Sequence, residues 1–159
     1  MDKETAGTAL ALVTLVAVFA ALQPILPTNP SRYSELGVLG PNMTIGSYPT
    51  SVAQGDIIQL YCYIANHEGT VTYYQVQVKL GNSATQVSNA TAANAPEIFS
   101  HSVVLPDNGS SMFPVALGMN ASGADQRLIF ELWAYNVSSS QFAYTGLWNQ
   151  LVINVTGGP

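Results

Sequence analysis

The chain has 159 residues, of which only 8% are charged, with four lysines and arginines against nine aspartates and glutamates. An ordinary soluble protein has about 25% charged residues, and so few cations cannot neutralise a phosphate backbone, which argues against nucleic acid as a partner. Once an N-terminal anchor is set aside, about 125 residues remain, enough for one domain with one hydrophobic core.

Residues 7–26 form an apolar segment, and no charged residue occurs between Glu4 and Arg32. About 20 helical residues, rising about 1.5 Å each, span the roughly 30 Å hydrocarbon core of a bilayer. The sequence therefore predicts one N-terminal transmembrane α-helix within residues 1–26, with membrane lipid as a partner. A cleaved signal peptide is the alternative, but the first five residues carry two acids and one lysine, whereas a signal peptide begins with a cationic region.

The segment after the anchor is rich in proline, with Pro24, Pro27 and Pro30 at every third position. Proline fixes the backbone angle φ and removes an N–H donor, which favours a stiff, extended chain. Residues 27–31 are therefore predicted to be a spacer, and residues 32–159 an extracellular β-sandwich domain.

From residue 32 onward, apolar residues recur at every second position, and turn residues interrupt them at regular intervals. This pattern is typical of β-strands with one buried face. The predicted strands are residues 34–39, 57–65, 71–80, 98–105, 112–117, 127–135 and 146–155. We expect the second and third of these to pair across the turn at residues 66–69, and Pro114 to mark an edge strand. About seven short strands in one domain predict an all-β fold, an immunoglobulin-like β-sandwich.

Six of the eleven asparagines lie in Asn-x-Ser/Thr motifs. Such asparagines accept N-linked glycans on the exported side of a membrane. We therefore expect a single-pass protein of the cell membrane with its N-terminus inside and its C-terminal domain extracellular. The predicted glycosylation sites are Asn42, Asn89, Asn108, Asn120, Asn136 and Asn154.

No constellation of residues predicts catalysis. Cys62 is the only cysteine and lies on the same alternating face as apolar neighbours, which indicates a buried side chain. A metal site needs three or four convergent ligands, and the chain has only two histidines, His67 and His101. The pair His67 and Glu68 is better explained by a turn between strands. We therefore predict no catalytic, cofactor-binding or metal-binding residues, no cofactor, and no enzymatic activity.

Aromatic residues on the polar sides of the predicted strands indicate a contact surface instead. Tyrosine and tryptophan bury a large area at low entropic cost and are common in protein interfaces. The predicted interaction face consists of Tyr61, Tyr63, Tyr73, Trp133 and Tyr135.

Several short motifs occur in a fixed order along the predicted domain. They are Leu-Gly-Pro at residues 39–41, Tyr-Pro-Thr at residues 48–50, Asn-His-Glu at residues 66–68, and Leu-Trp at residues 147–148. In this series residues 32–156 resemble an archaeal family of membrane-anchored proteins that is known as domain of unknown function sixteen-sixteen. The resemblance implies an extracytoplasmic β-domain in an archaeon and implies no activity.

Two functions remain open. The first is a non-catalytic accessory or scaffold subunit of a larger archaeal membrane complex, for which the small residues of the anchor would permit close helix packing. The alternative is a structural protein of the cell envelope, associated with a surface layer or filament. The expected partners are membrane lipid, other membrane or cell-envelope proteins, and N-linked glycans.

Overall fold

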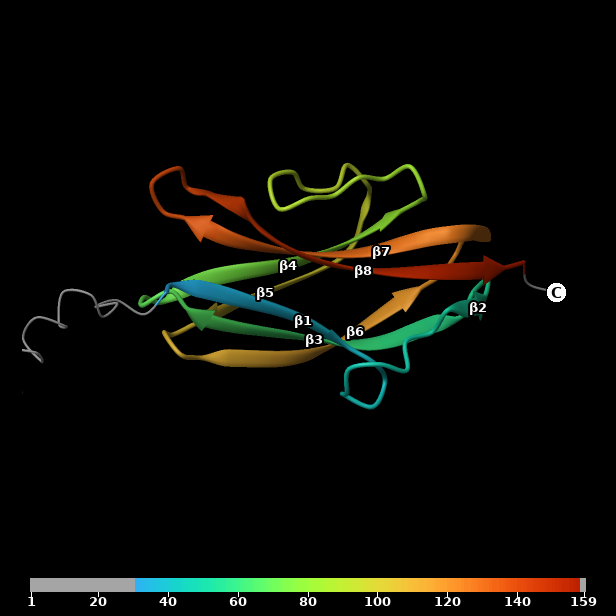
Figure 1. Cartoon of the computed structure of the whole chain (residues 1–159), viewed down its shortest axis with the longest axis horizontal. Coiled ribbons are helices and arrows are strands. Elements are labelled where there is room, and N and C mark those ends of the chain that lie inside the picture. Colours follow the sequence, from blue (N-terminus) through green and yellow to red (C-terminus); the bar gives the residue numbers. More distant parts are fainter. Residues whose placement is uncertain (1–30, 158–159) are drawn as a thin grey trace, which may run out of the picture. The chain divides into compact units, whose positions relative to one another are not determined.

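The computed structural model describes residues 31–157, and this part of the chain is all β (Figure 1). The strands are β1 (Tyr33–Leu39), β2 (Ser51–Ala53), β3 (Ile57–His67), β4 (Thr72–Gly81), β5 (Glu97–Leu105), β6 (Ser110–Gly118), β7 (Gly123–Asn136) and β8 (Gln141–Thr156). Within the described residues there is no helix that could cross a bilayer. The predicted anchor at residues 1–26 and most of the spacer at residues 27–31 lie outside the described part of the chain.

The strands form two sheets. One has three strands in the order β1-β3-β6, and the other has five in the order β2-β8-β7-β4-β5. All neighbours are antiparallel except β2 and β8, which are parallel. β1 begins at the end of the sandwich that carries the β7–β8 hairpin, and β8 finishes at the opposite end (Figure 1). The expected immunoglobulin-like sandwich is thereby confirmed.

The core lies between the inner faces of the two sheets. Alternating residues of β3 and β6 meet alternating residues of β4, β7 and β8, because a strand turns every second side chain to the same side. The largest fully buried side chains include Leu60, Tyr74, Phe130, Leu132 and Ile153. Burial of one such aliphatic or aromatic side chain contributes about 1.5–3 kcal/mol, so this shared layer is what holds the sheets together.

One predicted pairing is wrong. β3 and β4 do not form a hairpin, because β3 pairs with β1 and β6 while β4 pairs with β5 and β7. The connection at residues 68–71 carries the chain from one sheet to the other. Alternation identifies the buried face of each strand but not its neighbour, so two strands that face each other across a core look like a hairpin in the sequence.

The side chain of Asn66 fixes this crossing. It is fully buried, and its amide Nδ2 donates to the carbonyl oxygens of Thr70, Leu105 and Pro106 at 2.7, 2.9 and 3.1 Å. Its Oδ1 accepts hydrogen bonds from the Tyr74 hydroxyl and from the Glu68 N–H, each at 3.1 Å. Asn66 thus joins the end of β3 to the start of β4 and to the β5–β6 turn.

The strands differ from the sequence prediction in other respects as well. β2 has only three residues, too few to show an alternating pattern, and it is absent from the predicted set. β8 begins at Gln141 rather than at residue 146. The prediction that Pro114 marks an edge is confirmed, since β6 is an outer strand of the three-stranded sheet.

Candidate interaction face and the loop over the five-stranded sheet

The five residues of the predicted interaction face lie in two places. Tyr61 and Tyr63 lie on β3, in the three-stranded sheet, whereas Tyr73 lies on β4 and Trp133 and Tyr135 on β7, in the five-stranded sheet. Each alternates with core residues along its strand, so all five lie on outer faces. The structure therefore brings together Tyr73, Trp133 and Tyr135, and separates them from Tyr61 and Tyr63.

On the five-stranded sheet, one apolar row crosses four strands. Val104 pairs with Tyr73, and Tyr135 pairs with Phe142, while β4 and β7 are direct neighbours. The ring centroids of Tyr73 and Phe142 lie 5.0 Å apart, and those of Tyr135 and Phe142 lie 5.4 Å apart. We call these four residues the aromatic patch. Val104, Tyr73 and Tyr135 keep 57%, 40% and 37% of their surface exposed, so the patch is open to a partner.

Two valines enlarge this surface. Val71 and Val137, each two residues from a tyrosine of the aromatic patch, are 67% and 81% exposed. Phe142 was not among the predicted residues because the sequence prediction started the last strand at residue 146. The signal that could have found it is the alternation of Phe142 with Tyr144 along β8.

The three-stranded sheet has its own apolar outer face. Tyr61 pairs with Leu39 on one side and Pro114 on the other, and Tyr63 pairs with Met112. Met112 is 48% exposed, whereas both tyrosines are half-buried. This second face therefore offers less open aromatic surface than the aromatic patch.

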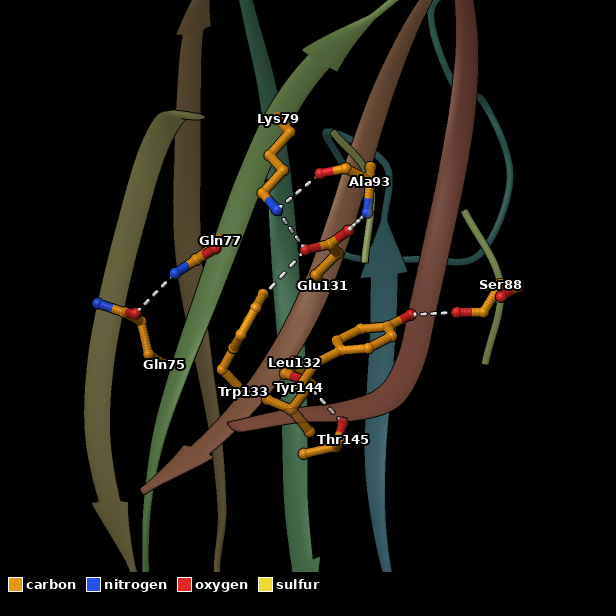
Figure 2. Close-up of polar contacts among 10 residues, drawn as sticks. All are labelled: Gln75, Gln77, Lys79, Ser88, Ala93, Glu131, Leu132, Trp133, Tyr144 and Thr145. Atoms are coloured by element: carbon orange, nitrogen blue, oxygen red, sulfur yellow. Dashed lines mark hydrogen bonds and ion pairs between the residues drawn. The ribbon is translucent and has the colours of Figure 1, made fainter. Parts of the chain in front are cut away.

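Beside the aromatic patch, the same outer face carries a buried ion pair (Figure 2). Lys79 Nζ lies 2.9 Å from a carboxylate oxygen of Glu131, and Glu131 is completely buried. A charged residue that alternates with core residues along a strand is expected to meet water, but Lys79 is only 9% exposed. Trp133 Nε1 donates to Glu131 at 3.2 Å, and Lys79 Nζ lies 5.3 Å from the centre of the Trp133 ring.

The cover over this ion pair is the segment of residues 82–96, which connects β4 to β5 and passes over the sheet (Figure 1). Ala93 supplies both of its backbone groups: its N–H donates to Glu131, and its carbonyl oxygen accepts from Lys79 Nζ at 3.0 Å. The Tyr144 hydroxyl donates to the Ser88 carbonyl at 2.8 Å (Figure 2). Side chains of β4, β7 and β8 thus hold a loop that has no strand of its own.

Tyr144 belongs to the same network. Its ring lies 5.5 Å from that of Trp133. Burial, together with the nearby charge of Glu131, raises the pKa of Tyr144 to about 12, because both effects disfavour a phenolate. Tyr144 therefore remains a neutral hydrogen-bond donor to the loop across the physiological pH range.

All six asparagines of the predicted glycosylation sites have exposed side chains: Asn42, Asn89, Asn108, Asn120, Asn136 and Asn154. By contrast, Asn66, which is outside any such motif, is fully buried, and Asn149 is half-buried and donates to the Leu36 carbonyl at 2.9 Å. The acceptor asparagines are thus all accessible, as glycosylation requires.

The polar pair His67 and Glu68 does not form a joint site. His67 Nδ1 lies 3.0 Å from Asn108 Oδ1, and its ring stacks on Tyr33 at 4.6 Å. Glu68 instead accepts a 2.6 Å hydrogen bond from the Ser34 hydroxyl. Within residues 31–157, no group of three His, Cys, Asp or Glu side chains is placed to hold a metal ion. The two side chains therefore serve the contacts around the β3–β4 connection.

Cys62 lies in the core, as its position in the alternating pattern predicts. Its side chain is completely buried, and burial raises the pKa of the thiol to about 12. A thiol that stays protonated is a poor nucleophile, so its environment is that of a small hydrophobic residue.

Solved structures of two kinds of protein align with this chain. The CARDB domain of the PF1109 protein from Pyrococcus furiosus, solved in complex with di-metal ions, aligns with 81% of this chain and 95% of its own length, at 10% identity and a TM-score of 0.50. A β-glucosidase from Listeria innocua aligns with 82% of this chain at 12% identity and a TM-score of 0.48, and the aligned part is only 17% of that enzyme. Among curated proteins, none matches the sequence.

The family comparison covers most of the chain. A family model described as Domain of unknown function matches residues 27–148, which includes β1 to β7 and the first half of β8. This confirms the resemblance found in the sequence motifs. The protein belongs to the family named Domain of unknown function (DUF1616), and its described part is an immunoglobulin-like sandwich.

Proposed function

We propose that this protein is a non-catalytic accessory or scaffold subunit of a larger archaeal membrane complex. In this proposal, residues 1–26 anchor it in the cell membrane and the sandwich stands outside the cell. The observation that supports it best is the aromatic patch on the outer face of the five-stranded sheet. Its three aromatic rings contact one another, and two of them are more than one-third exposed.

An exposed cluster of this kind favours protein contact. Isolated apolar residues are normal on a surface, but a contiguous group with Val71 and Val137 beside it is a mark of an interaction site. Tyrosines at such sites lose little conformational entropy on binding. The aromatic patch lies at the end of the sheet that carries the β7–β8 hairpin, where β1 also begins (Figure 1). This is the end of the domain that follows the expected anchor along the chain.

The partner surface should be apolar rather than charged. The residues of the aromatic patch and the two valines beside it carry no charge. On β4, the next residue on the same face after Tyr73 is Gln75, a polar residue that accepts a hydrogen bond from Gln77 at 2.9 Å. Salt should therefore weaken the association little, since screening acts on charged contacts.

The experiment is a purification of the full-length protein from its native membrane in mild detergent, with identification of the proteins that accompany it. The test variant is Tyr73→Ser with Tyr135→Ser, and the matched control is Tyr61→Ser with Tyr63→Ser on the other sheet. We expect the subunits of one membrane complex to accompany the unchanged protein and the control, and to be lost with the test variant.

Two other results would contradict the proposal. If the same subunits accompany the test variant, the aromatic patch is not the contact. If the protein is recovered with surface-layer or filament proteins instead, the alternative function applies, that of a structural protein of the cell envelope.

A further inference from the structure

A second surface feature lies on the same outer face, where the loop of residues 82–96 meets β7 and β8. It is a pocket of about 590 Å³, separate from the aromatic patch. The described residues that line it include Trp148 and Gln150 from β8, Arg127 from β7, and Gln86, Ser88 and Thr91 from the loop. The pocket therefore combines one indole ring with several hydrogen-bonding groups.

The strands fix the floor of the pocket. Trp148 and Gln150 are two residues apart on β8 and so lie on the same face, next to Glu131 and Ile129 of β7. Trp148 keeps 37% of its surface exposed although it lies beside the buried ion pair. A tryptophan held on a rigid strand with an open ring is a suitable platform for stacking.

The loop forms an ordered wall. It is held by the contacts of Ala93 with the ion pair, by the hydrogen bond from Tyr144 to Ser88, and by Arg127 Nη1, which donates to the Thr85 carbonyl at 3.1 Å. At Gly146, a Cβ atom would lie 2.5 Å from the Asn89 carbonyl oxygen, so the absence of a side chain lets the loop close on β8. Loops of about 15 residues without regular structure are uncommon and are usually functional.

The charge of the residues that line the pocket limits the kind of ligand that it can bind. Residues 82–96 contain no charged side chain, and Arg127 is the one charged residue among the described residues that line the pocket. A guanidinium has five N–H donors, and only the bond to Thr85 uses one of them within residues 31–157. The pocket therefore suits a neutral or acidic ligand that is rich in hydroxyl oxygens, and disfavours a cation.

We propose that this pocket binds a saccharide residue, a hexose or hexuronic acid. The C–H groups on one face of a pyranose ring carry partial positive charge and pack on the negative face of an aromatic ring, here Trp148. The hydroxyl groups at the ring edge then bond to Gln150, Arg127 and the polar side chains of the loop. The pocket is large enough for one or two sugar units, within the usual range of ligand sites.

The sugar has two potential sources. Asn89, an exposed residue of a glycosylation motif, lies in the chain between Ser88 and Thr91, both of which line the pocket. A glycan on Asn89 would therefore begin at the edge of the pocket. The other source is an external glycan of the cell envelope. Both present the same chemistry to Trp148.

The experiment uses the full-length chain, produced without N-glycosylation and kept in a detergent that has no sugar headgroup. The chain has two tryptophans, so the emission of the unchanged chain is compared with that of its Trp148→Phe variant, and a change that the variant lacks is assigned to Trp148. Added hexoses, hexuronic acids and disaccharides should change this emission saturably. Gln150→Ala should weaken binding about tenfold, which is the loss of one good polar contact, whereas Gln75→Ala on the same sheet face is the control and should bind normally.

The second arm compares glycosylated protein with its Asn89→Gln variant. If the glycosylated protein ignores added sugar and already emits like the saturated protein, the ligand is the protein's own glycan. If the glycosylated protein and its Asn89→Gln variant bind the added sugar equally well, the ligand is an external glycan. The proposal is overturned if the unglycosylated chain binds no sugar of the panel and Trp148 emission is the same with and without the Asn89 glycan.

Discussion

The buried ion pair of Lys79 and Glu131 gives the most demanding test of the structure. We consider Lys79→Met, which preserves most of the side-chain volume and removes the charge. Glu131 has no exposed surface, and Lys79 is its only cationic partner within the described residues. Removal of one partner from a buried pair leaves an uncompensated charge and costs about 3–5 kcal/mol. The typical free energy of unfolding is only about 5–15 kcal/mol, so the loss is large.

Two further variants separate the effect of the charges on stability from the effect of the hydrogen bonds. Glu131→Gln keeps an acceptor for the Ala93 N–H but leaves the Lys79 ammonium buried with a single carbonyl partner. It should also cost about 3 kcal/mol or more. In the double variant, Lys79→Met with Glu131→Gln, neither charge is buried. The double variant should therefore be more stable than either single variant, with a favourable coupling of about 2–3 kcal/mol.

The assay is denaturant unfolding of the full-length chain, followed by the combined emission of its two tryptophans, Trp133 and Trp148. For a domain of this size, a loss of 3–5 kcal/mol corresponds to a fall in melting temperature of about 10–20 °C. Because Ala93 is held by both partners, Lys79→Met should also speed protease cleavage within residues 82–96. If Lys79→Met costs less than about 1 kcal/mol, the pair is effectively solvated and the reasoning is refuted.

Three further predictions concern the core. Asn66→Ala should lower the free energy of unfolding by about 3 kcal/mol, because it leaves several buried partners, among them the Tyr74 hydroxyl, without their hydrogen bond to Asn66. Equal unfolding midpoints for variant and parent would contradict this. Leu60→Ala, at a completely buried position, should cost about 2–5 kcal/mol, while its exposed neighbour Gln59→Ala should cost less than about 0.5 kcal/mol in the same unfolding assay. Burial raises the pKa of Cys62 from 9.0 to about 12, so as the pH rises the thiol ionises in the unfolded chain before it ionises in the folded one. The contribution of the protonated thiol to the free energy of unfolding is therefore fully present below pH 9 and is lost as the pH rises above it. Relative to Cys62→Ala, the parent should lose about 1.4 kcal/mol per pH unit between about pH 9 and 12, and parallel stability curves would rule this out.

The sequence predicted which face of each strand is buried more accurately than it predicted which strands pair with one another. Tyr74, Val76 and Val78 on β4, and Leu128 and Phe130 on β7, recur at every second position within predicted strands, and all are completely buried. Alternation follows from the geometry of one strand, so it needs no knowledge of the rest of the chain. The pairing of β3 with β6 across the 42 intervening residues 68–109 depends on long-range packing, which a local pattern does not contain.

The candidate site was predicted only in part. Tyr73, Trp133 and Tyr135 were identified because aromatic residues at polar positions of a strand stand out. Glu131 and Lys79 were not, because a charge on the outer face of a strand usually meets water, and here a loop excludes the water. That loop has no periodic pattern, so its position over β7 follows from contacts such as those of Ala93 and not from its composition.

The outer face of β7 connects the two proposed surfaces. Its alternating residues Arg127, Glu131 and Tyr135 belong in turn to the saccharide pocket, the ion pair and the aromatic patch. Eight residues of strand extend about 27 Å, so a sugar at one end and a protein at the other could bind without steric conflict. The ion pair in the middle holds the loop that walls the pocket but makes no contact with Tyr73 or Phe142 among the described hydrogen bonds. Lys79→Met should therefore weaken sugar binding while leaving the protein contact in place, and equal loss of both would show that the face acts as one site.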